Sequence, residues 1–449
     1  MIEVLLAALG LIFFFIFLAL PLHIRLLMVL VCSVPQLYLV QLGGADVPLA
    51  FLLPALLLPE LIINANRFLA KPTNIALLGL ICISTLSLAW SVEKSMGIRD
   101  IAYLTEFIVI SNAIYVLALK DRIALYKTIN VMIFFICLQA ITVIIFRLNE
   151  SLELAIVLSP VSKFTMGMNT LQGLLDGVRN NFYDPVKAGG VLFVNANAAA
   201  CYAGISSFMA WGIYKALKSK ITLLMAILLW LTVFFTGSKA GVLFAVLIPA
   251  FIFYLKLQRS TKVVVGSVGA SFAIILIAIS VIFSVVEQSG FLQESTDTAE
   301  ARYQIWNYAF NAFLNNPLMG QGFGGWEVDY SQHSDYFLPP HNTLIYLWSK
   351  SGVIASIMGI AFILGSIGIA LRAIKNASAE QKNIGFALLM VLSWLFAHGF
   401  GENFGLIGEP HQMMVLAVML GLCMAGNVQI TRKIRDKNEN GRYFQGPTI

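Results

Sequence analysis

Charged residues are scarce in this chain. They make up only 12% of its 449 residues, whereas 59% are hydrophobic. A soluble globular protein with this balance would expose large apolar patches, so that class is excluded. Apolar runs of about 17 to 25 residues, each long enough to cross a bilayer as a helix, instead recur along the whole chain. The sequence therefore predicts an all-α, polytopic transmembrane helical bundle of about 12 or 13 spans.

The predicted spans follow the apolar runs from one end of the chain to the other. They are 3–20, 23–42, 47–64, 74–91, 98–119, 123–146, 188–214, 221–237, 239–256, 263–286, 341–372, 383–400 and 409–428. Residues 1–20 lack a basic leader and a small-residue cleavage site, so we expect the first segment to be retained. The span 341–372 is too long for one straight crossing, and we expect Gly352 or Gly359 to bend it.

Cysteine is also scarce, and no two cysteines form a CxxC pair. The five cysteines all fall inside apolar runs: Cys32, Cys82, Cys137, Cys201 and Cys423. This placement suggests neither a disulfide nor a zinc site. We expect them to be small core residues.

Basic and acidic residues are distributed unequally between the two sides of the membrane in the predicted topology. If the basic C-terminal tail "TRKIRDKNENGR" is cytoplasmic and the spans alternate, roughly two thirds of the 29 Lys and Arg residues lie on the cytoplasmic side. Most of the 23 Asp and Glu residues then lie outside, and the N-terminus is also outside. The net charge of +6 is explained by cytoplasmic anchors that face anionic lipid headgroups, so a nucleic-acid partner is not needed.

This topology divides the chain into six parts and shows no internal repeat. They are N-terminal transmembrane helices (1–146), a first outer loop (147–187), central transmembrane helices (188–286), a large outer loop (287–340), C-terminal transmembrane helices (341–430) and a cytoplasmic tail (431–449). Both outer loops are rich in aromatic and apolar residues, which argues against disorder.

The large outer loop is predicted to contain its own helix, capped by Thr298. One stripe at helical spacing consists of Arg302, Ile305, Trp306, Ala309, Phe310 and Phe313. Arg302 shares an apolar stripe, so it should have an anionic partner. Glu300, Asp297 and a lipid headgroup are the candidates.

Polar residues gather where four spans meet the outer side. They are Asn195 and Asn197; Ser238 and Lys239; His341 and Asn342; and His398, Glu402, Asn403, Glu409 and His411. Each alone has an ordinary structural explanation, such as a helix cap or a solvated turn. Together, fixed cations, imidazole and amides at one membrane boundary favour a site that handles phosphate groups.

Four motifs in this order resemble the O-antigen ligases and the related O-antigen and exopolysaccharide polymerases. They are "GGVLFVNANAAA", "TGSKAGVLFA", "ARYQIWNYAFNAFLNNPLMGQGFGGW" and "PPHNTLIYLWSKSGVIAS". The resemblance covers residues 188 to about 372, and the N-terminal spans match only in hydropathy.

The resemblance implies an enzyme, an inverting glycosyltransferase in the bacterial inner membrane whose outer loops and active site face the periplasm. Its donor would be a glycan on undecaprenyl pyrophosphate, and its acceptor lipid A-core or another lipid-linked glycan. The family's histidine falls on His341 as general base, and its loop arginine on Arg302. The family's second arginine falls on Lys239, which keeps the charge but loses the planar fork that binds two phosphate oxygens.

Further substrate contacts are expected from Asn342, Asn197, Arg179, Trp306 and Ser238. The resemblance also implies a reaction without a metal or other cofactor. The acidic residues of the large loop lack a compact Asp-x-Asp spacing, and we interpret them as a solvated face; they are Glu294, Asp297, Glu327, Asp329 and Asp335.

Two alternatives stay open. A ligase and a polymerase differ only in the acceptor, and no residue here is tied to one of them. A membrane transporter or flippase for a lipid-linked or anionic substrate is the rival from another class. Transporters carry charges near mid-membrane, whereas most charges here lie at span ends, with Asp100 and Glu106 as exceptions and Arg99 beside Asp100.

Overall fold

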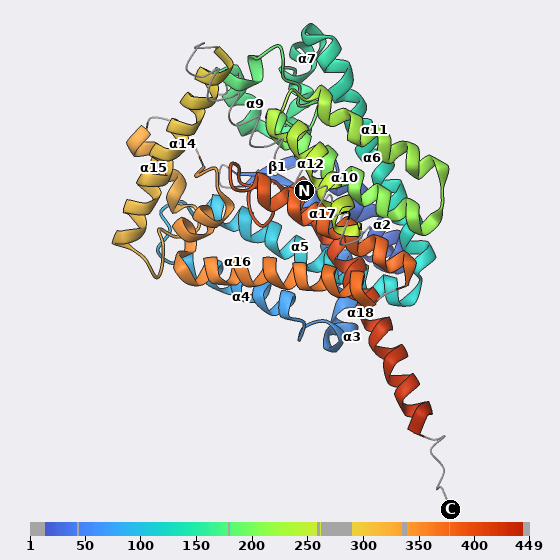
Figure 1. Cartoon of the computed structure of the whole chain (residues 1–449). Coiled ribbons are helices and arrows are strands. Elements are labelled where there is room, and N and C mark those ends of the chain that lie inside the picture. The colour runs from blue at the N-terminus through green and yellow to red at the C-terminus, as the bar shows by residue number, and fades with distance from the viewer. Residues whose placement is uncertain are drawn as a thin grey trace, which may run out of the picture.

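The computed structural model describes residues 14–42, 45–177, 180–257, 261, 290–334, 339–376 and 378–442. Over these ranges the chain is mostly helical, with one antiparallel pair of strands, so the predicted all-α class is confirmed (Figure 1). The elements, with η for 3-10 helices, are α2 (Leu22–Ser33), β1 (Tyr38–Leu42), β2 (Ala45–Pro48), η1 (Leu49–Phe51), η2 (Leu53–Leu57), α3 (Leu58–Asn64), η3 (Ala65–Arg67), α4 (Pro72–Ser87), α5 (Lys94–Lys120), α6 (Arg122–Leu148), α7 (Glu150–Val157), η4 (Pro160–Ser162), α8 (Lys163–Met166), α9 (Met168–Leu175), η5 (Asn180–Tyr183), α10 (Ala196–Leu217), α11 (Lys220–Phe235), α12 (Lys239–Lys256), α14 (Gly290–Asn315), α15 (Gly325–Ser334), α16 (Thr343–Asn376), α17 (Ala379–His398) and α18 (Pro410–Arg442).

The helices confirm a polytopic membrane protein. Among the described residues, four helical stretches are long and apolar enough to cross a bilayer: Leu49–Arg67, Lys94–Lys120, Arg122–Leu148 and Thr343–Lys375. Five shorter apolar helices accompany them: Leu22–Ser33, Pro72–Ser87, Lys220–Phe235, Lys239–Leu255 and Pro410–Gly426. The predicted span 263–286, and most of 3–20, lie outside the described residues. The total number of crossings therefore stays a prediction.

The predicted span 23–42 is wrong in its second half. Helix α2 ends at Ser33, because Pro35 cannot continue a helix and Gln36 and Leu37 adopt positive φ angles of 60° and 54°. The chain then enters the β1–β2 hairpin, which pairs Gln41 with Asp46. Apolar composition alone does not distinguish a short strand from the end of a helix.

The predicted span 188–214 also starts too early. Helix α10 begins at Ala196, where the side chain of Asn195 caps it by accepting a hydrogen bond from the Asn197 backbone N–H at 2.8 Å. The residues before it run as irregular backbone. Asn197 therefore lies in the first turn of a helix rather than inside a span.

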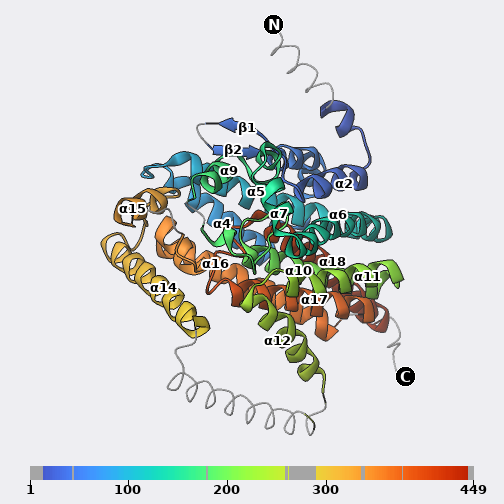
Figure 2. The same cartoon turned by 90° about the horizontal axis from the view of Figure 1, so that it is seen from above.

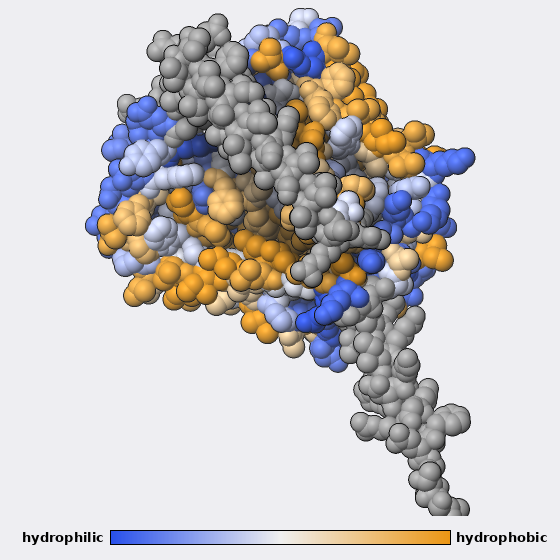
Figure 3. All heavy atoms as spheres, viewed as in Figure 1, coloured by the Kyte–Doolittle hydropathy of each residue, from blue (hydrophilic) through white to orange (hydrophobic). Residues whose placement is uncertain are grey.

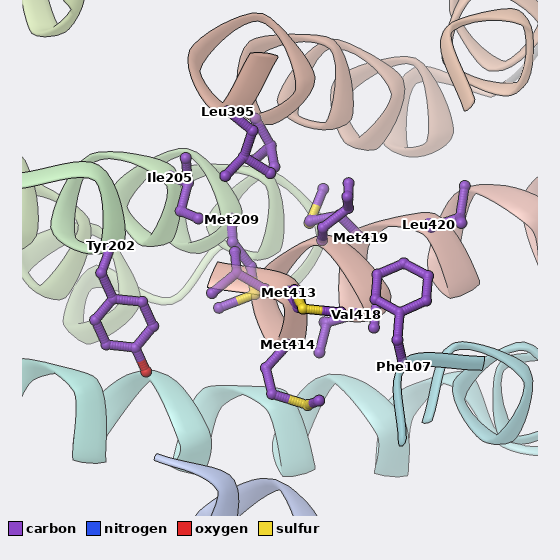
Figure 4. Close-up of a cluster of buried hydrophobic side chains, with 14 of the residues drawn as sticks. Phe107, Tyr202, Ile205, Met209, Leu395, Met413, Met414, Val418, Met419 and Leu420 are labelled. Carbon is purple, nitrogen blue, oxygen red and sulfur yellow. The ribbon is translucent and has the colours of Figure 1, made fainter. Parts of the chain in front are cut away.

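The core centres on α18. Every residue from Met413 to Ala425 is buried. Its methionines pack against α5 and α10, as the close-up in Figure 4 shows with Phe107 and Met209. Unbranched methionine side chains fill irregular gaps between helices that meet from several directions.

Contacts between distant segments respect the predicted sides. At the predicted outer end, the Asn169 backbone N–H donates to Asp46 at 2.9 Å, and the Ala188 backbone N–H donates to the Thr236 carbonyl at 3.0 Å. At the predicted inner end, Thr222 donates to Asn130 at 2.7 Å. These three contacts each join residues that the prediction puts at the same end, and the alternation of the spans stays a prediction. Which end faces the periplasm stays a prediction.

Helix α16 is kinked where the sequence allowed it. Ser351 and Gly352 depart from helical angles, and Gly352 has φ 76° and ψ −173°, so the bend predicted at Gly352 or Gly359 lies at Gly352. A Cβ at Gly352 would overlap the carbonyl of Leu318. The kink therefore lets the glycine-rich loop 316–325 lie directly against the α16 backbone.

This loop positions the outer helices α14 and α15. The Gln321 backbone N–H donates to the Ser349 carbonyl at 2.8 Å, and the Phe323 backbone N–H donates to the hydroxyl of Ser87 at 3.0 Å. Figure 2 shows α14 and α15 beside α16. In Figure 3, hydrophilic residues gather over α14 and α15, while hydrophobic ones cover α16 and the side formed by α6 and α11.

Candidate functional site

His341 stands in strained backbone just before α16. Its φ is 50°, in the left-handed region that non-glycine residues seldom adopt. Asn342 caps the helix, because its side-chain oxygen accepts hydrogen bonds from the backbone N–H groups of Leu344 and Ile345 at 3.0 and 3.1 Å. Trp306 of α14 fixes the chain on the other side by donating from its indole to the Pro340 carbonyl at 2.7 Å.

The loop between α17 and α18 is tied to this helix start. The hydroxyl of Thr343 donates to the Phe404 carbonyl at 2.6 Å, and the backbone N–H of Thr343 donates to Gly399 at 2.9 Å. The backbone N–H of Asn342 donates to the side chain of Asn403 at 3.1 Å. These bonds hold Glu402, which the same loop carries, next to His341.

Glu402 is the centre of the cluster. Its side chain is only 8% exposed, and its Oε2 lies 3.1 Å from Nδ1 of His341. Its Oε1 accepts a hydrogen bond from the Asn197 amide at 2.9 Å and from the Arg302 guanidinium at 3.4 Å. Three of the residues singled out from the sequence therefore meet on one buried carboxylate.

The partners keep this carboxylate ionised. Burial alone would raise the pKa of Glu402, but the hydrogen bonds from His341 and Asn197 oppose it, and the pKa lies below its usual value. An ionised carboxylate can only accept, so Nδ1 of His341 carries the hydrogen and donates a hydrogen bond to Glu402. In a neutral imidazole, Nε2 then has the free lone pair. The His341 side chain is 23% exposed.

The network continues through Asn197 to the start of α12. The Ser238 hydroxyl donates to the side-chain oxygen of Asn197 at 2.6 Å, and Ser238 caps α12 by accepting from the Gly241 backbone N–H at 3.1 Å. Gly237 turns the chain here with φ 76°, where a Cβ would overlap the carbonyl of Val186. Lys239, the first residue of α12, is exposed next to this capped end.

Not every residue selected from the sequence joins the cluster. Arg179 lies outside the described residues. The indole N–H of Trp306 is used to hold Pro340, so a contact between Trp306 and substrate stays a prediction. The expectation that Thr298 caps the outer helix is wrong, because α14 begins at Gly290. The upstream run of Leu292, Gln293 and Glu294 consists of good helix formers, so the helix does not have to begin at Thr298.

The partner of Arg302 was missed. The sequence suggested Glu300, Asp297 or a lipid headgroup, whereas the ion pair in the structure joins Arg302 to Glu402, 100 residues away. Glu402 was visible as an acidic residue in an outer turn, but no local spacing links it to α14. Within the described ranges, no group of three or more His, Cys, Asp or Glu side chains is placed to hold a metal ion.

The comparisons with known proteins agree with the motifs. No curated protein matches the chain. Residues 224–360 match the sequence profile of the family described as O-antigen ligase. The matched region includes Ser238, Lys239, Arg302, Trp306 and His341 and excludes Asn197 and Glu402. Over residues 224–360, less than half of its length, the chain is therefore similar to the O-antigen ligase family.

Proposed function

We propose that the protein is an inverting, metal-independent glycosyltransferase of the bacterial inner membrane. It would transfer a glycan from undecaprenyl pyrophosphate to an acceptor hydroxyl at the periplasmic face. The observation that carries this proposal is the Glu402 carboxylate shared by His341 and Arg302. It puts a candidate base and a candidate phosphate-binding cation side by side at the predicted outer end.

His341 is the proposed general base. The acceptor oxygen attacks the anomeric carbon of the donor sugar, and its proton passes to Nε2 of His341. Glu402 holds the ring in the tautomer that leaves this nitrogen free and stabilises the imidazolium that forms. General base catalysis of this kind contributes about 10²- to 10⁴-fold to a rate.

Arg302 and Lys239 are the proposed partners of the leaving group. As the bond between the anomeric carbon and the pyrophosphate oxygen breaks, its electron pair stays on the pyrophosphate. Fixed positive charges near that oxygen stabilise the transition state. The side chain of Arg302 is 31% exposed, so its guanidinium is accessible to a substrate while one N–H stays on Glu402. Attack opposite the leaving group inverts the anomeric centre.

Two amides and a hydroxyl support these groups. Asn197 and Ser238 connect the carboxylate to the start of α12, where Lys239 lies. Asn342 caps α16 and so fixes the position of His341. Their proposed role is to align donor and base within hydrogen-bonding distance, since small misplacements are costly in rate.

The test is a transfer assay with the purified protein and a lipid-linked glycan donor. Released undecaprenyl pyrophosphate and the glycosylated product are measured with and without EDTA. We expect equal rates in both arms. Loss of turnover with EDTA and its recovery with a divalent cation would contradict the metal-independent mechanism.

The same assay separates ligase from polymerase. With lipid-linked repeat units alone, a polymerase elongates them, whereas a ligase turns over only when lipid A-core is added. A transporter or flippase would move the lipid-linked substrate across a vesicle bilayer without breaking the pyrophosphate bond, so movement without release would contradict the proposed function.

A further inference from the structure

A second charged cluster lies at the predicted outer end, on α5 and α16. Lys350 is fully buried, and its ammonium donates to Oδ2 of Asp100 at 2.6 Å. The same ammonium lies 4.1 Å from the ring centre of Tyr346 and 5.1 Å from that of Phe323. Lys350 therefore neutralises Asp100 within an aromatic enclosure.

Arg99 adds a second cation to this single carboxylate. Its Nε is 3.8 Å from Oδ1 of Asp100, too far for a hydrogen bond. This Nε is also buried without a hydrogen-bond partner. The side chain is 36% exposed. Arg99, Lys350 and Asp100 together carry one net positive charge, while the carboxylates of Asp46 and Glu409 act electrostatically on Tyr38.

Three tyrosines belong to this part of the fold. Tyr103 stands one helical turn after Arg99 on α5. The ring of Tyr346 packs against the ammonium of Lys350, which is bonded to Asp100. The hydroxyls of Tyr38 and Tyr103 lie 3.5 Å apart. A guanidinium fork with neighbouring hydroxyl donors matches the oxygens of a phosphate or a carboxylate. An arginine at a membrane boundary also needs an anionic partner.

The cluster borders the same structure that carries the proposed active site. Tyr346 lies in the first turns of α16, and its backbone N–H donates to the carbonyl of Asn342 at 2.9 Å. A substrate held at Arg99 would therefore reach the catalytic loop from α5, while Arg302 approaches it from α14.

We propose that Arg99, together with the hydroxyls of Tyr38, Tyr103 and Tyr346, binds an anionic group of the acceptor glycolipid. This inference rests on the proposed function, in which Arg302 and Lys239 serve the donor pyrophosphate. Two separate cationic sites that border one loop suit a reaction with two substrates. The ligand is a phosphate or carboxylate on the acceptor, and a phospholipid headgroup is the competing source of the same chemistry.

The experiment compares Arg99→Ala, Arg99→Lys and Arg122→Ala with the wild type in nanodiscs. Arg122 is the matched control, because it is an arginine of the opposite end and pairs with Glu380 at 3.3 Å. With a phosphorylated acceptor glycolipid, Arg99→Ala should raise the acceptor KM about 10- to 100-fold, as expected for a lost charge-assisted hydrogen bond. The donor KM, and kcat at saturating acceptor, should stay near wild type. The acceptor KM of Arg99→Lys should lie between those of the wild type and Arg99→Ala, and the acceptor KM of Arg122→Ala should match the wild type.

Phosphatase-treated acceptor decides the source of the anion. If Arg99 binds the acceptor phosphate, wild type and Arg99→Ala should show the same KM for the treated acceptor. The proposal would be overturned if Arg99→Ala still raised the KM for the treated acceptor and this increase disappeared in nanodiscs without anionic phospholipid. A raised donor KM in Arg99→Ala would also overturn it. Tyr103→Phe, which removes only a hydroxyl, should raise the acceptor KM by a smaller factor.

Direct binding separates this proposal from the proposed function. Acceptor binding to the same variants is measured by native mass spectrometry without donor. If Arg99→Ala binds the phosphorylated acceptor more weakly than the wild type does, the anion site is supported, even if no transfer occurs with any donor. Thermal unfolding first checks that both proteins are folded. Equal binding of the acceptor by wild type and Arg99→Ala then overturns the proposed anion site.

Discussion

Glu402 binds three side chains that come from three different parts of the chain. His341, Asn197 and Arg302 were each predicted from their position at a membrane boundary, and each prediction used only local sequence. The residue that joins them lies 61 positions beyond His341 and 205 beyond Asn197. Such a partner follows from helix packing, which a single sequence does not specify.

Replacing Glu402 with Gln tests its proposed role. Gln keeps the size of the side chain but removes the charge that fixes the tautomer of His341 and stabilises its imidazolium. We expect kcat to fall about 10²-fold, within the range for general acid–base catalysis, with a smaller change in donor KM. The measurement is steady-state glycan transfer. Near-normal kcat in folded Glu402→Gln would show that Glu402 has no part in catalysis.

The pH dependence of stability follows from the same carboxylate. Although burial opposes it, the bonds from His341 and Asn197 lower the pKa of Glu402 below its ordinary value of 4.5. A carboxyl whose pKa is lower in the folded state stabilises the fold above its unfolded pKa, and this contribution is lost as pH falls through the folded pKa.

We therefore expect wild type to be more stable than Glu402→Gln at pH 7, with a gap that narrows below about pH 4.5. The melting temperature in detergent, measured from pH 7 to about pH 3, checks this. A gap that stays constant over the whole range would mean that the charge of Glu402 contributes nothing to stability.

At the scale of elements, the kink of α16 depends on one glycine. Gly352 has φ 76° and no room for a Cβ, whereas Gly368 lies in the same helix with nothing within 4 Å of the position where its Cβ would be. Gly352→Ala should therefore destabilise the protein by about 1 to 3 kcal/mol or more, from strain and overlap. Gly368→Ala should be neutral or stabilising by about 0.5 to 1 kcal/mol. Thermal unfolding of the two variants measures the contrast, and equal melting temperatures would contradict the kinked geometry.

The buried pair of Lys350 and Asp100 provides a second test at this scale. Lys350→Met alone removes the hydrogen-bonded cation from the buried Asp100 carboxylate and leaves it the more distant Arg99, 3.8 Å away, so it should cost up to about 3 to 5 kcal/mol. Replacing Asp100 by Leu in the same variant removes that charge, so the double variant should be more stable than Lys350→Met. Denaturation of both single variants and the double variant measures the coupling. Simple addition of the two losses would contradict a direct ion pair.

The sequence predicted helices better than it predicted their ends. The apolar runs identified the long helices α5, α6 and α16, because hydropathy and length are properties of the chain itself. The β1–β2 hairpin and the late start of α10 escaped prediction, since both are set by local turns and by neighbours distant in sequence. Glycine gave the clearest local signal, because the long span 341–372 required a bend and Gly352 supplied it.

At the scale of the whole molecule, the account requires two distinct sides. Asp176 is exposed at the predicted outer end and Lys382 at the predicted inner end. In a variant without its five native cysteines, a cysteine at position 176 should react in intact cells with a maleimide that enters the periplasm but not the cytoplasm. A cysteine at position 382 should react only after lysis. The reverse pattern would invert the topology and place the proposed site in the cytoplasm.

The most direct test of the central claim is glycan transfer by purified His341→Ala. The account predicts that this variant inserts and folds like the wild type but releases pyrophosphate from the lipid-linked donor at least about 100-fold more slowly. Turnover close to wild type by folded His341→Ala would contradict the claim that this imidazole is the base at the centre of the site.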